Sequence, residues 1–344
     1  MRRLVALALM LAGGGAALAA APTGDGDAVL APLAPRSLLL DVALIPGGGG
    51  LLAVGERGHV LLSRDGGMSW QQRVVPTRAN LTAAHFADAN HGWAVGHDEV
   101  ILRTSDGGLS WTRTHFAPQH QQPLLGVNFD SAGHGLAVGA FATIYRSQDG
   151  GSSWTLTPFE PHPLPAAGAS RKTRARDAMR EDEGISQPHL YAVARATSGA
   201  LYLAAEAGHL YRSDDAGGSW SELPSPYAGS FFGLVPLAGE SLLACGLRGH
   251  LYRSDDAGRS WQQLESHTEA LLAGGSRLAD GTVVIVGLTG VVLVSRDGGH
   301  RFRLHREPDR KGFDAVAPAA DGAIVVTGEG GARRLVLADL DGGG

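Results

Sequence analysis

Ser63-Arg64-Asp65-Gly66-Gly67-Met68-Ser69-Trp70 is the first of six related octapeptides in this chain of 344 residues. Each begins with Ser or Thr, has Asp at its third position and Gly at its fifth, and ends in an aromatic residue. The Asp and aromatic pairs are Asp65 and Trp70, Asp106 and Trp111, Asp149 and Trp154, Asp215 and Trp220, Asp256 and Trp261, and Asp297 and Phe302. The aromatic positions are 41, 43, 66, 41 and 41 residues apart. This spacing predicts tandem structural repeats.

The residue types of the octapeptide suit a tight turn. The side chains of Ser63 and Asp65 can accept hydrogen bonds from backbone N–H groups, and Gly takes a positive φ at little steric cost. The aromatic residue can pack beneath the turn, where its burial contributes about 2–3 kcal/mol. The motif resembles the Asp box, also called the BNR repeat. Each turn has too few spaced carboxylates for a calcium loop, so we expect no metal site.

Apolar runs surround each box in the same order. In the first repeat they cover residues 38–42, 51–55 and 60–62, and Trp70 opens a further run to residue 75. Gly closes the second run in several repeats, as at Gly55. Four short strands in about 41 residues are typical of one blade of a β-propeller.

A seventh unit follows the sixth box. It covers residues 313–317, 323–328 and 334–337, and residues 339–343 have the composition of a degenerate box. The chain ends where a fourth strand would begin. The apolar segment 28–33, ahead of the first unit, can supply that strand and close the ring, which removes the free edges. We therefore predict an all-β, seven-bladed β-propeller in which an N-terminal strand completes the last blade.

The N-terminus has the pattern of a secretory signal. Arg2 and Arg3 precede a short apolar run and an Ala17-Leu18-Ala19 cleavage site. We predict a signal peptide at 1–19, a single propeller domain at 20–344 and export to the periplasm. The one cysteine, Cys245, lies in an apolar run and is expected to be a buried small side chain. A net charge of −5 argues against a nucleic-acid partner.

An insertion accounts for the long interval between the third and fourth boxes. Residues 161–187 contain few apolar side chains, and a basic stretch precedes an acidic one. We interpret the insertion as a mobile loop between blades three and four, because it lacks a core of its own. The alternative is a partner-docking arm, for which the candidate contacts are Arg171, Lys172, Arg174 and Arg176.

Four arginines occupy the position directly before the box Ser or Thr. They are Arg103, Arg146, Arg212 and Arg253, whereas the first and sixth repeats have Leu62 and Val294 there. One interpretation is structural, with each guanidinium bonding local carbonyls or the neighbouring Asp box. The other is a ring of positive charge that binds an acidic protein or lipid headgroups.

Sialidases also contain Asp boxes, so catalytic residues were sought. The segment 43–46 lacks the arginine that a sialidase would have near its first blade, and nothing marks Tyr227 as a nucleophile. The histidines, among them His115 and His120, do not fall in a metal-binding motif. We expect no catalytic residue, no metal and no cofactor. The alternative function is a secreted sialidase-like or carbohydrate-binding propeller.

The repeats resemble one family in particular. The stretch 140–154, with Tyr145-Arg146-Ser147 leading into its box, is similar to the photosystem II stability/assembly factors and their bacterial relatives. The resemblance covers residues 28–344. It implies a non-enzymatic propeller that assists assembly of a membrane protein complex, photosystem-like or a transporter, on the periplasmic or lumenal side. It also implies that Arg103, Arg146, Arg212 and Arg253 contact the partner. We expect a monomer.

Overall fold

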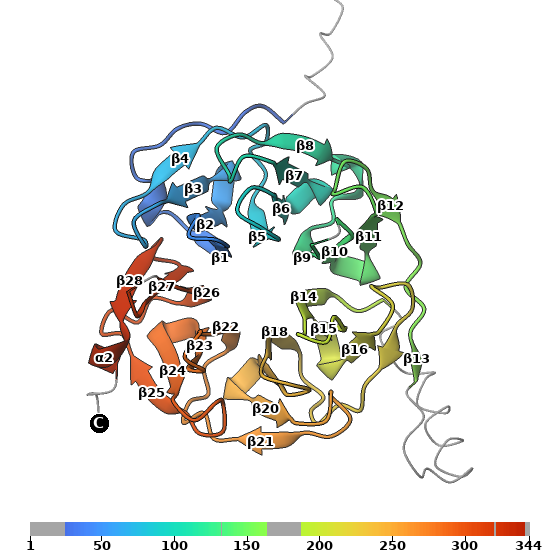
Figure 1. The fold of residues 1–344 in the computed structure, drawn as a ribbon, viewed down its shortest axis with the longest axis vertical. Helices are drawn as coiled ribbons and strands as arrows, with labels where there is room; N and C mark the ends of the chain where they lie inside the picture. Colours follow the sequence, from blue (N-terminus) through green and yellow to red (C-terminus); the bar gives the residue numbers. More distant parts are fainter. Residues whose placement is uncertain (1–24, 132, 164–186, 320, 341–344) are drawn as a thin grey trace, which may run out of the picture.

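The computed structural model describes residues 25–131, 133–163, 187–319 and 321–340. Seven sheets stand around a central opening, and the chain visits them in order (Figure 1). In each blade the first strand lies nearest the central opening, and the later strands follow in order toward the outside of the ring. The predicted seven-bladed, all-β propeller is therefore confirmed.

The strand bounds follow the repeat spacing. Blade one contains β1 (Leu39–Ile45), β2 (Gly50–Gly55), β3 (Val60–Ser63) and β4 (Gln71–Arg73). Blade two contains β5 (Leu81–Phe86), β6 (Gly92–Gly96), β7 (Ile101–Thr104) and β8 (Thr112–His115). Blade three contains β9 (Leu124–Phe129), β10 (Gly135–Gly139), β11 (Ile144–Ser147) and β12 (Thr155–Leu156).

The second half of the ring has the same order. Blade four contains β14 (Leu190–Arg195), β15 (Leu201–Ala205), β16 (Leu210–Ser213) and β17 (Ser221–Glu222). Blade five contains β18 (Phe231–Pro236), β19 (Leu242–Gly246), β20 (Leu251–Ser254) and β21 (Gln262–Leu264). Blade six contains β22 (Leu272–Arg277), β23 (Val283–Gly287), β24 (Val291–Ser295) and β25 (Arg303–Arg306). Blade seven contains β26 (Phe313–Pro318), β27 (Ala323–Gly328) and β28 (Arg333–Val336), followed by helix α2 (Leu337–Leu340).

The core lies between neighbouring blades. Every residue of β6, β10, β15, β19 and β23 is buried, because these second strands are covered on both sides. Their side chains are therefore apolar without alternation. One cluster joins Leu243 and Cys245 of β19 to Ile285 and Leu293 of blade six, which confirms that Cys245 is buried.

Because consecutive strands of a blade are antiparallel, successive turns lie on opposite faces of the propeller. The boxes join the third and fourth strands on what we call the box face. On the opposite face, the turn face, six 3₁₀ turns join the second and third strands. These turns are Glu56–Gly58, His97–Glu99, Ala140–Ala142, Glu206–Gly208, Leu247–Gly249 and Leu288–Gly290.

All seven inner strands have a β-bulge near their first residue, on the turn face. The register shift leaves one residue of each inner strand unpaired with the second strand. These bulge residues are Leu40, Thr82, Leu125, Tyr191, Phe232, Ala273 and Asp314. A bulge changes the direction of its side chain, and each of these residues has no partner on the second strand. Their side chains can therefore differ from blade to blade without breaking the strand pairing.

The predicted closure by an N-terminal strand is wrong. Residues 28–33 form no strand and lie along the outside of blade one, where the Ala28 N–H donates to the Val75 carbonyl and the Ala31 N–H to Gln72 Oε1. Pro32 and Pro35 lack the N–H groups that a ladder needs. The first blade is instead β1–β4, and blade seven keeps three strands among the described residues.

Side-chain packing closes the ring. One cluster combines Leu51 and Leu61 of blade one with Ala317 and Val325 of blade seven. Ala34, which is fully buried, belongs to the same cluster. After β28, helix α2 includes the first two residues of the degenerate box predicted at 339–343, and its residues Leu337 and Leu340 are buried against blade six.

Three predicted segments extend outside the described residues: the signal peptide, the insertion and the end of the degenerate box at 339–343. The signal peptide at 1–19 does so entirely, and of the insertion only its beginning and Gln187 are described. That beginning, β13 (His162–Pro163), pairs in parallel with β17 at the outer edge of blade four (Figure 1). The three residues before 164 therefore continue the propeller.

Candidate interaction surfaces

The six boxes have nearly the same hydrogen bonds. In the first box, Ser63 Oγ donates to Asp65 Oδ1 over 2.8 Å and accepts the Gly67 N–H over 2.8 Å. Asp65 Oδ1 accepts the Ser69 N–H over 2.9 Å, and the Ser69 hydroxyl bonds Oδ2. These bonds, above all those from Ser69, lower the pKa of Asp65 to about 2. The carboxylates are occupied within their own turns.

The box aromatics pack into the blades. Trp111, Trp220 and Phe302 are buried, whereas Trp70, Trp154 and Trp261 are half-buried. The close approach explains the box Gly. Gly67 has φ +86°, and a Cβ there would lie 2.4 Å from Val325 Cγ2 of blade seven. These contacts fit the structural role expected for the boxes.

The four predicted arginines reach from each blade to the next. Arg146 Nη2 donates to the Ala216 carbonyl in the box of blade four over 3.5 Å, and Arg253 Nη1 donates to Gly298 in the box of blade six over 2.8 Å. Arg212 pairs with Asp214 over 2.7 Å and lies 3.9 Å from Glu240 of blade five.

Arg103 extends toward the box of blade three. Together with Asp88, Asp149 and Gly150 it lines a hollow of about 290 Å³ on the box face. Its Nε is buried without a hydrogen-bond partner. The contacts of Arg146, Arg212 and Arg253 are of the kind that the structural interpretation describes, while binding of an acidic partner stays a prediction.

Blades one and six use a different residue for the same contact. Their boxes lack the preceding arginine, yet the residue after the box Ser is Arg64 in one and Arg296 in the other. Arg64 Nη2 donates to the Gly107 carbonyl of blade two over 3.0 Å, and Arg296 Nη2 donates to the Leu337 carbonyl of blade seven over 3.5 Å. An arginine therefore spans each junction from blade one to blade seven.

A further arginine occupies this position in blade seven. The strand register places Arg334 where Arg103 stands in blade two, and Leu335 where the box Ser stands. Arg334 bonds Asp321 of its own blade. It was missed in the sequence because no box follows it. The predicted basic residues Arg171, Lys172, Arg174 and Arg176 lie outside the described residues.

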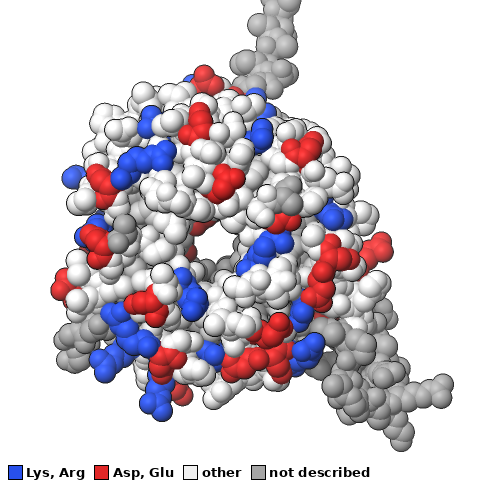
Figure 2. Space-filling view, in the orientation of Figure 1, with Lys and Arg blue, Asp and Glu red and all other residues white. Residues whose placement is uncertain are grey.

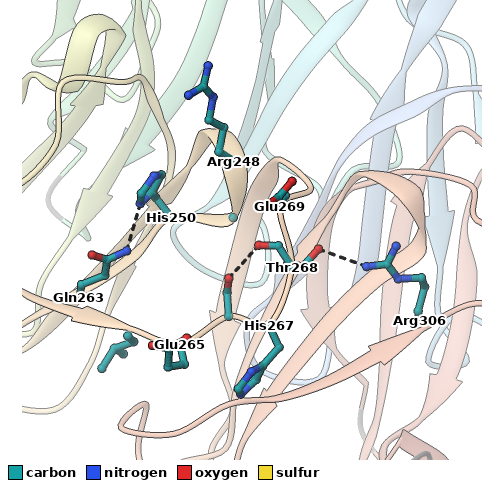
Figure 3. A pocket seen from close by; sticks show the side chains of 11 residues that line it. Arg248, His250, Gln263, Glu265, His267, Thr268, Glu269 and Arg306 are labelled. Carbon is teal, nitrogen blue, oxygen red and sulfur yellow. Dashed lines mark hydrogen bonds between the residues drawn. The ribbon is translucent and has the colours of Figure 1, made fainter.

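The turn face has a polar pocket of about 610 Å³ between blades five and six (Figure 3). The His250 ring lies against the Tyr227 ring at a tilt of 32°, with centroids 4.0 Å apart, and its Nδ1 is 3.2 Å from Gln263 Nε2. Across the pocket, Arg306 Nη2 donates to Thr268 Oγ1 over 3.2 Å. Arg248 points away from these residues. The pocket is open and polar, without a nucleophile held by a base.

Glu99 forms the centre of a second polar cluster on the turn face. It is buried, and it accepts hydrogen bonds from the Tyr145 hydroxyl over 2.6 Å and from His120 Nδ1 over 3.0 Å. His115 Nε2 lies 3.5 Å away. Glu99 has φ +52° at a position where Gly58, Gly208, Gly249 and Gly290 stand in other blades. The cluster joins blade two to blade three, and the sequence reasoning missed it because its members come from three separate segments.

Polar residues also occur on the inner strands. Burial lowers the pKa of His85 to about 4, and its Nε2 is 3.1 Å from the Phe129 carbonyl. Burial raises the pKa of both Asp41 and Asp314 to about 6, and Asp314 is further raised by Glu329 and Asp41. Arg195 Nε donates to Asn128 Oδ1 over 3.0 Å. The inner strands are therefore less uniformly apolar than the sequence indicated.

Charges of both signs surround the central opening, and neither forms a continuous field (Figure 2). Within the described ranges, no three His, Cys, Asp or Glu side chains are placed to hold a metal ion. The same residues include no helix long and apolar enough to cross a membrane.

Comparison with known proteins connects this propeller to one family. Residues 30–121 match the family model described as Photosynthesis system II assembly factor YCF48. Over 103 residues the chain is 30% identical to the photosystem II stability/assembly factor HCF136, chloroplastic, of Oryza sativa subsp. japonica. Over this part of its length the chain is similar to the photosystem II assembly factors. The Arabidopsis thaliana protein of the same name is 28% identical over 102 residues.

The match to these assembly factors is partial. It covers 28% of this chain, and 24% of the rice and 25% of the Arabidopsis protein, so about a quarter of each relative is spanned. The residues that match the family model, 30–121, correspond to blades one and two.

Solved structures share the fold over most of the ring. YCF48 from Cyanidioschyzon merolae has a TM-score of 0.68 at 18% identity and covers 88% of this chain and 97% of its own. YCF48 bound to D1 peptide has a TM-score of 0.64 at 19% identity and covers 88% and 94%. A streptogramin B lyase has a TM-score of 0.67 at 13% identity and covers 87% and 93%. Propellers of this shape therefore include an enzyme as well as assembly factors, and the fold alone does not assign a function.

Proposed function

We propose that this chain is a non-enzymatic, exported propeller that assists assembly or stability of a membrane protein complex, photosystem-like or a transporter. The observation that carries the proposal is the match of residues 30–121 to the photosystem II assembly factor family. The curated relatives are named for the same role. One solved relative is described as bound to a D1 peptide, which makes an extended segment of a membrane subunit a reasonable partner.

The box face is the first surface to test for this partner. Its arginines already bond the next blade, and Arg253 in particular is 7% exposed. Arg146 is half-buried and makes one long bond of 3.5 Å, so we choose its guanidinium for the test with a partner carboxylate. The 171–176 basic stretch is proposed as a second contact.

Affinity capture tests the proposal. The mature chain, tagged at its C-terminus, is incubated with solubilised membranes of its source, and bound proteins are identified by mass spectrometry. We expect subunits of one membrane complex, at reduced yield with Arg146→Ala. Recovery of the same proteins with a denatured control, or of no membrane subunit, would contradict the proposal.

The alternative is a sialidase-like or carbohydrate-binding propeller. Purified protein should not hydrolyse a sialoside, because the arginines on its box face are bonded to neighbouring turns. Turnover of a fluorogenic sialoside that one point substitution abolishes would favour the alternative.

A further inference from the structure

Four aromatic rings form a row on the turn face. Phe141 is 4.8 Å from His189, His189 is 6.2 Å from Tyr191, and Tyr191 is 4.5 Å from Phe232, measured between ring centroids. The row begins at the 3₁₀ turn of blade three, crosses the start of blade four and ends on β18 of blade five. Tyr191 and Phe232 are bulge residues of the inner strands, so the row leads to the central opening. We call these four residues the aromatic row.

The outer end of the row is open to solvent. Phe141 is 51% exposed, and its backbone has φ +52° and ψ +45°. The next residue, Ala142, also has a positive φ, where four other blades have Gly. All six turns have a non-Gly residue with a positive φ at the position of Phe141, so it is the exposed aromatic side chain that distinguishes the turn of blade three. Thr289 stands at the same position in blade six, so the turn itself does not require an aromatic residue.

A carboxylate lies beside the middle of the row. Glu206 Oε2 accepts a hydrogen bond from the backbone N–H of His189 over 3.2 Å and lies 3.8 Å from the ring atom His189 Nε2. The side chain of Glu206 is 30% exposed. Burial, and next the charge of Glu206, raise the pKa of Tyr191.

Rings flanking an exposed carboxylate attract organic cations. The faces of the two Phe rings and of the Tyr ring are negative, and the nearby carboxylate adds a full charge. We propose that the aromatic row with Glu206 binds a lysine or arginine side chain of an extended segment in a partner protein. The three centroid distances together span about four to five extended residues at roughly 3.3 Å each.

The geometry favours a cationic peptide over a sugar. Neighbouring rings in the row are tilted by 58°, 33° and 38°, so they do not form the flat platform on which a pyranose would stack. A side chain that enters between tilted rings contacts them on several sides. This inference goes beyond the proposed function, because it concerns the face opposite the box arginines.

A labelled peptide tests the inference. The probe is a fluorescein-labelled hexapeptide of alternating lysine and proline, and binding to the folded chain is followed by fluorescence anisotropy. We expect saturable binding that Phe141→Ala weakens about tenfold and Glu206→Gln about fivefold. A peptide of alternating glutamate and proline should not bind.

Matched variants separate this site from general attraction to an acidic protein. Thr289→Ala changes the same turn position in blade six, and Glu240→Gln removes one exposed carboxylate from the box face. Both should bind the lysine peptide as the unmodified chain does. Equal affinity for all variants, or no binding of the lysine peptide, would overturn the inference. Binding of maltohexaose that depends on Phe141 but not on Glu206 would overturn it in favour of a sugar site.

Discussion

The two faces of the ring use the same residue types in opposite ways. On the box face, Asp65 is held by three hydrogen bonds from its own turn, and its pKa falls to about 2. On the turn face, burial raises the pKa of Asp314 to about 6. The box face repeats one arrangement six times, whereas the seven bulge residues of the turn face differ in size and charge. Repetition on one face holds the blades together, which leaves the other face free to vary.

The largest expected difference concerns buried and exposed aromatics. Trp220 is 4% exposed beneath the box of blade four, so Trp220→Ala should lower the free energy of unfolding by about 3–5 kcal/mol. Phe141→Ala on the turn face should change it by less than about 0.5 kcal/mol. Urea unfolding of both variants measures the difference. Similar losses would show that the aromatic row is part of the core.

The two kinds of aspartate should respond oppositely to pH. Because the folded pKa of Asp314 lies above its usual 3.8, stability decreases as pH rises from about 4 to about 6. Asp314→Asn should therefore stabilise the protein above pH 6 by up to about 3 kcal/mol, with no gain below pH 4. Thermal unfolding at pH 8 and pH 3.5 measures this effect.

The control for that experiment is a box carboxylate. The folded pKa of Asp65 lies below its usual value, so its contribution is present above about pH 4 and is lost as pH falls toward 2. Asp65→Asn should therefore destabilise at pH 8. A gain from both substitutions at pH 8 would remove the contrast between the faces.

A smaller effect distinguishes the arginines within the box face. Arg253 is buried, and it bonds both Asp255 and the Gly298 carbonyl of the next blade. Arg253→Ala should cost about 1–2 kcal/mol, because it leaves these acceptors without a donor. Arg146→Ala removes one bond of 3.5 Å and should cost less than about 0.5 kcal/mol. Chemical unfolding of the pair measures the order, and a reversed order would contradict the role assigned to the junctions.

The fold could be predicted from the sequence because the residues that form each box turn are neighbours in the chain. Ser63, Asp65 and Gly67 bond one another locally, so their spacing alone located the blades. The position of segment 28–33 does not depend on local hydrogen bonds of this kind. Its apolar residues suit a strand, but Gln72 and Val75 of blade one, which hold it, are more than 40 residues away.

The candidate sites were less predictable than the fold. Arg64 and Arg296 follow the box Ser instead of preceding it, so a motif search that looked before the box missed their contacts with the next blade. Phe141 and Phe232 are 91 residues apart in the sequence. They belong to one row only because blades three, four and five lie next to one another in the propeller. Long-range placement of this kind leaves no periodic signal in the chain.

The open side of blade seven has a consequence for self-association. Among the described residues no strand pairs with the outer side of β28, and an uncovered strand can template pairing with another molecule. Arg333 occupies the position of the buried Leu61 in blade one, and Arg334 follows it. Both guanidinium groups are paired with carboxylates, Arg333 with Glu307 and Asp309 and Arg334 with Asp321. Pairing with a second molecule along this edge would desolvate these ion pairs, which disfavours growth into fibres. The strand that lacks a partner is thus the one whose composition opposes polymerisation.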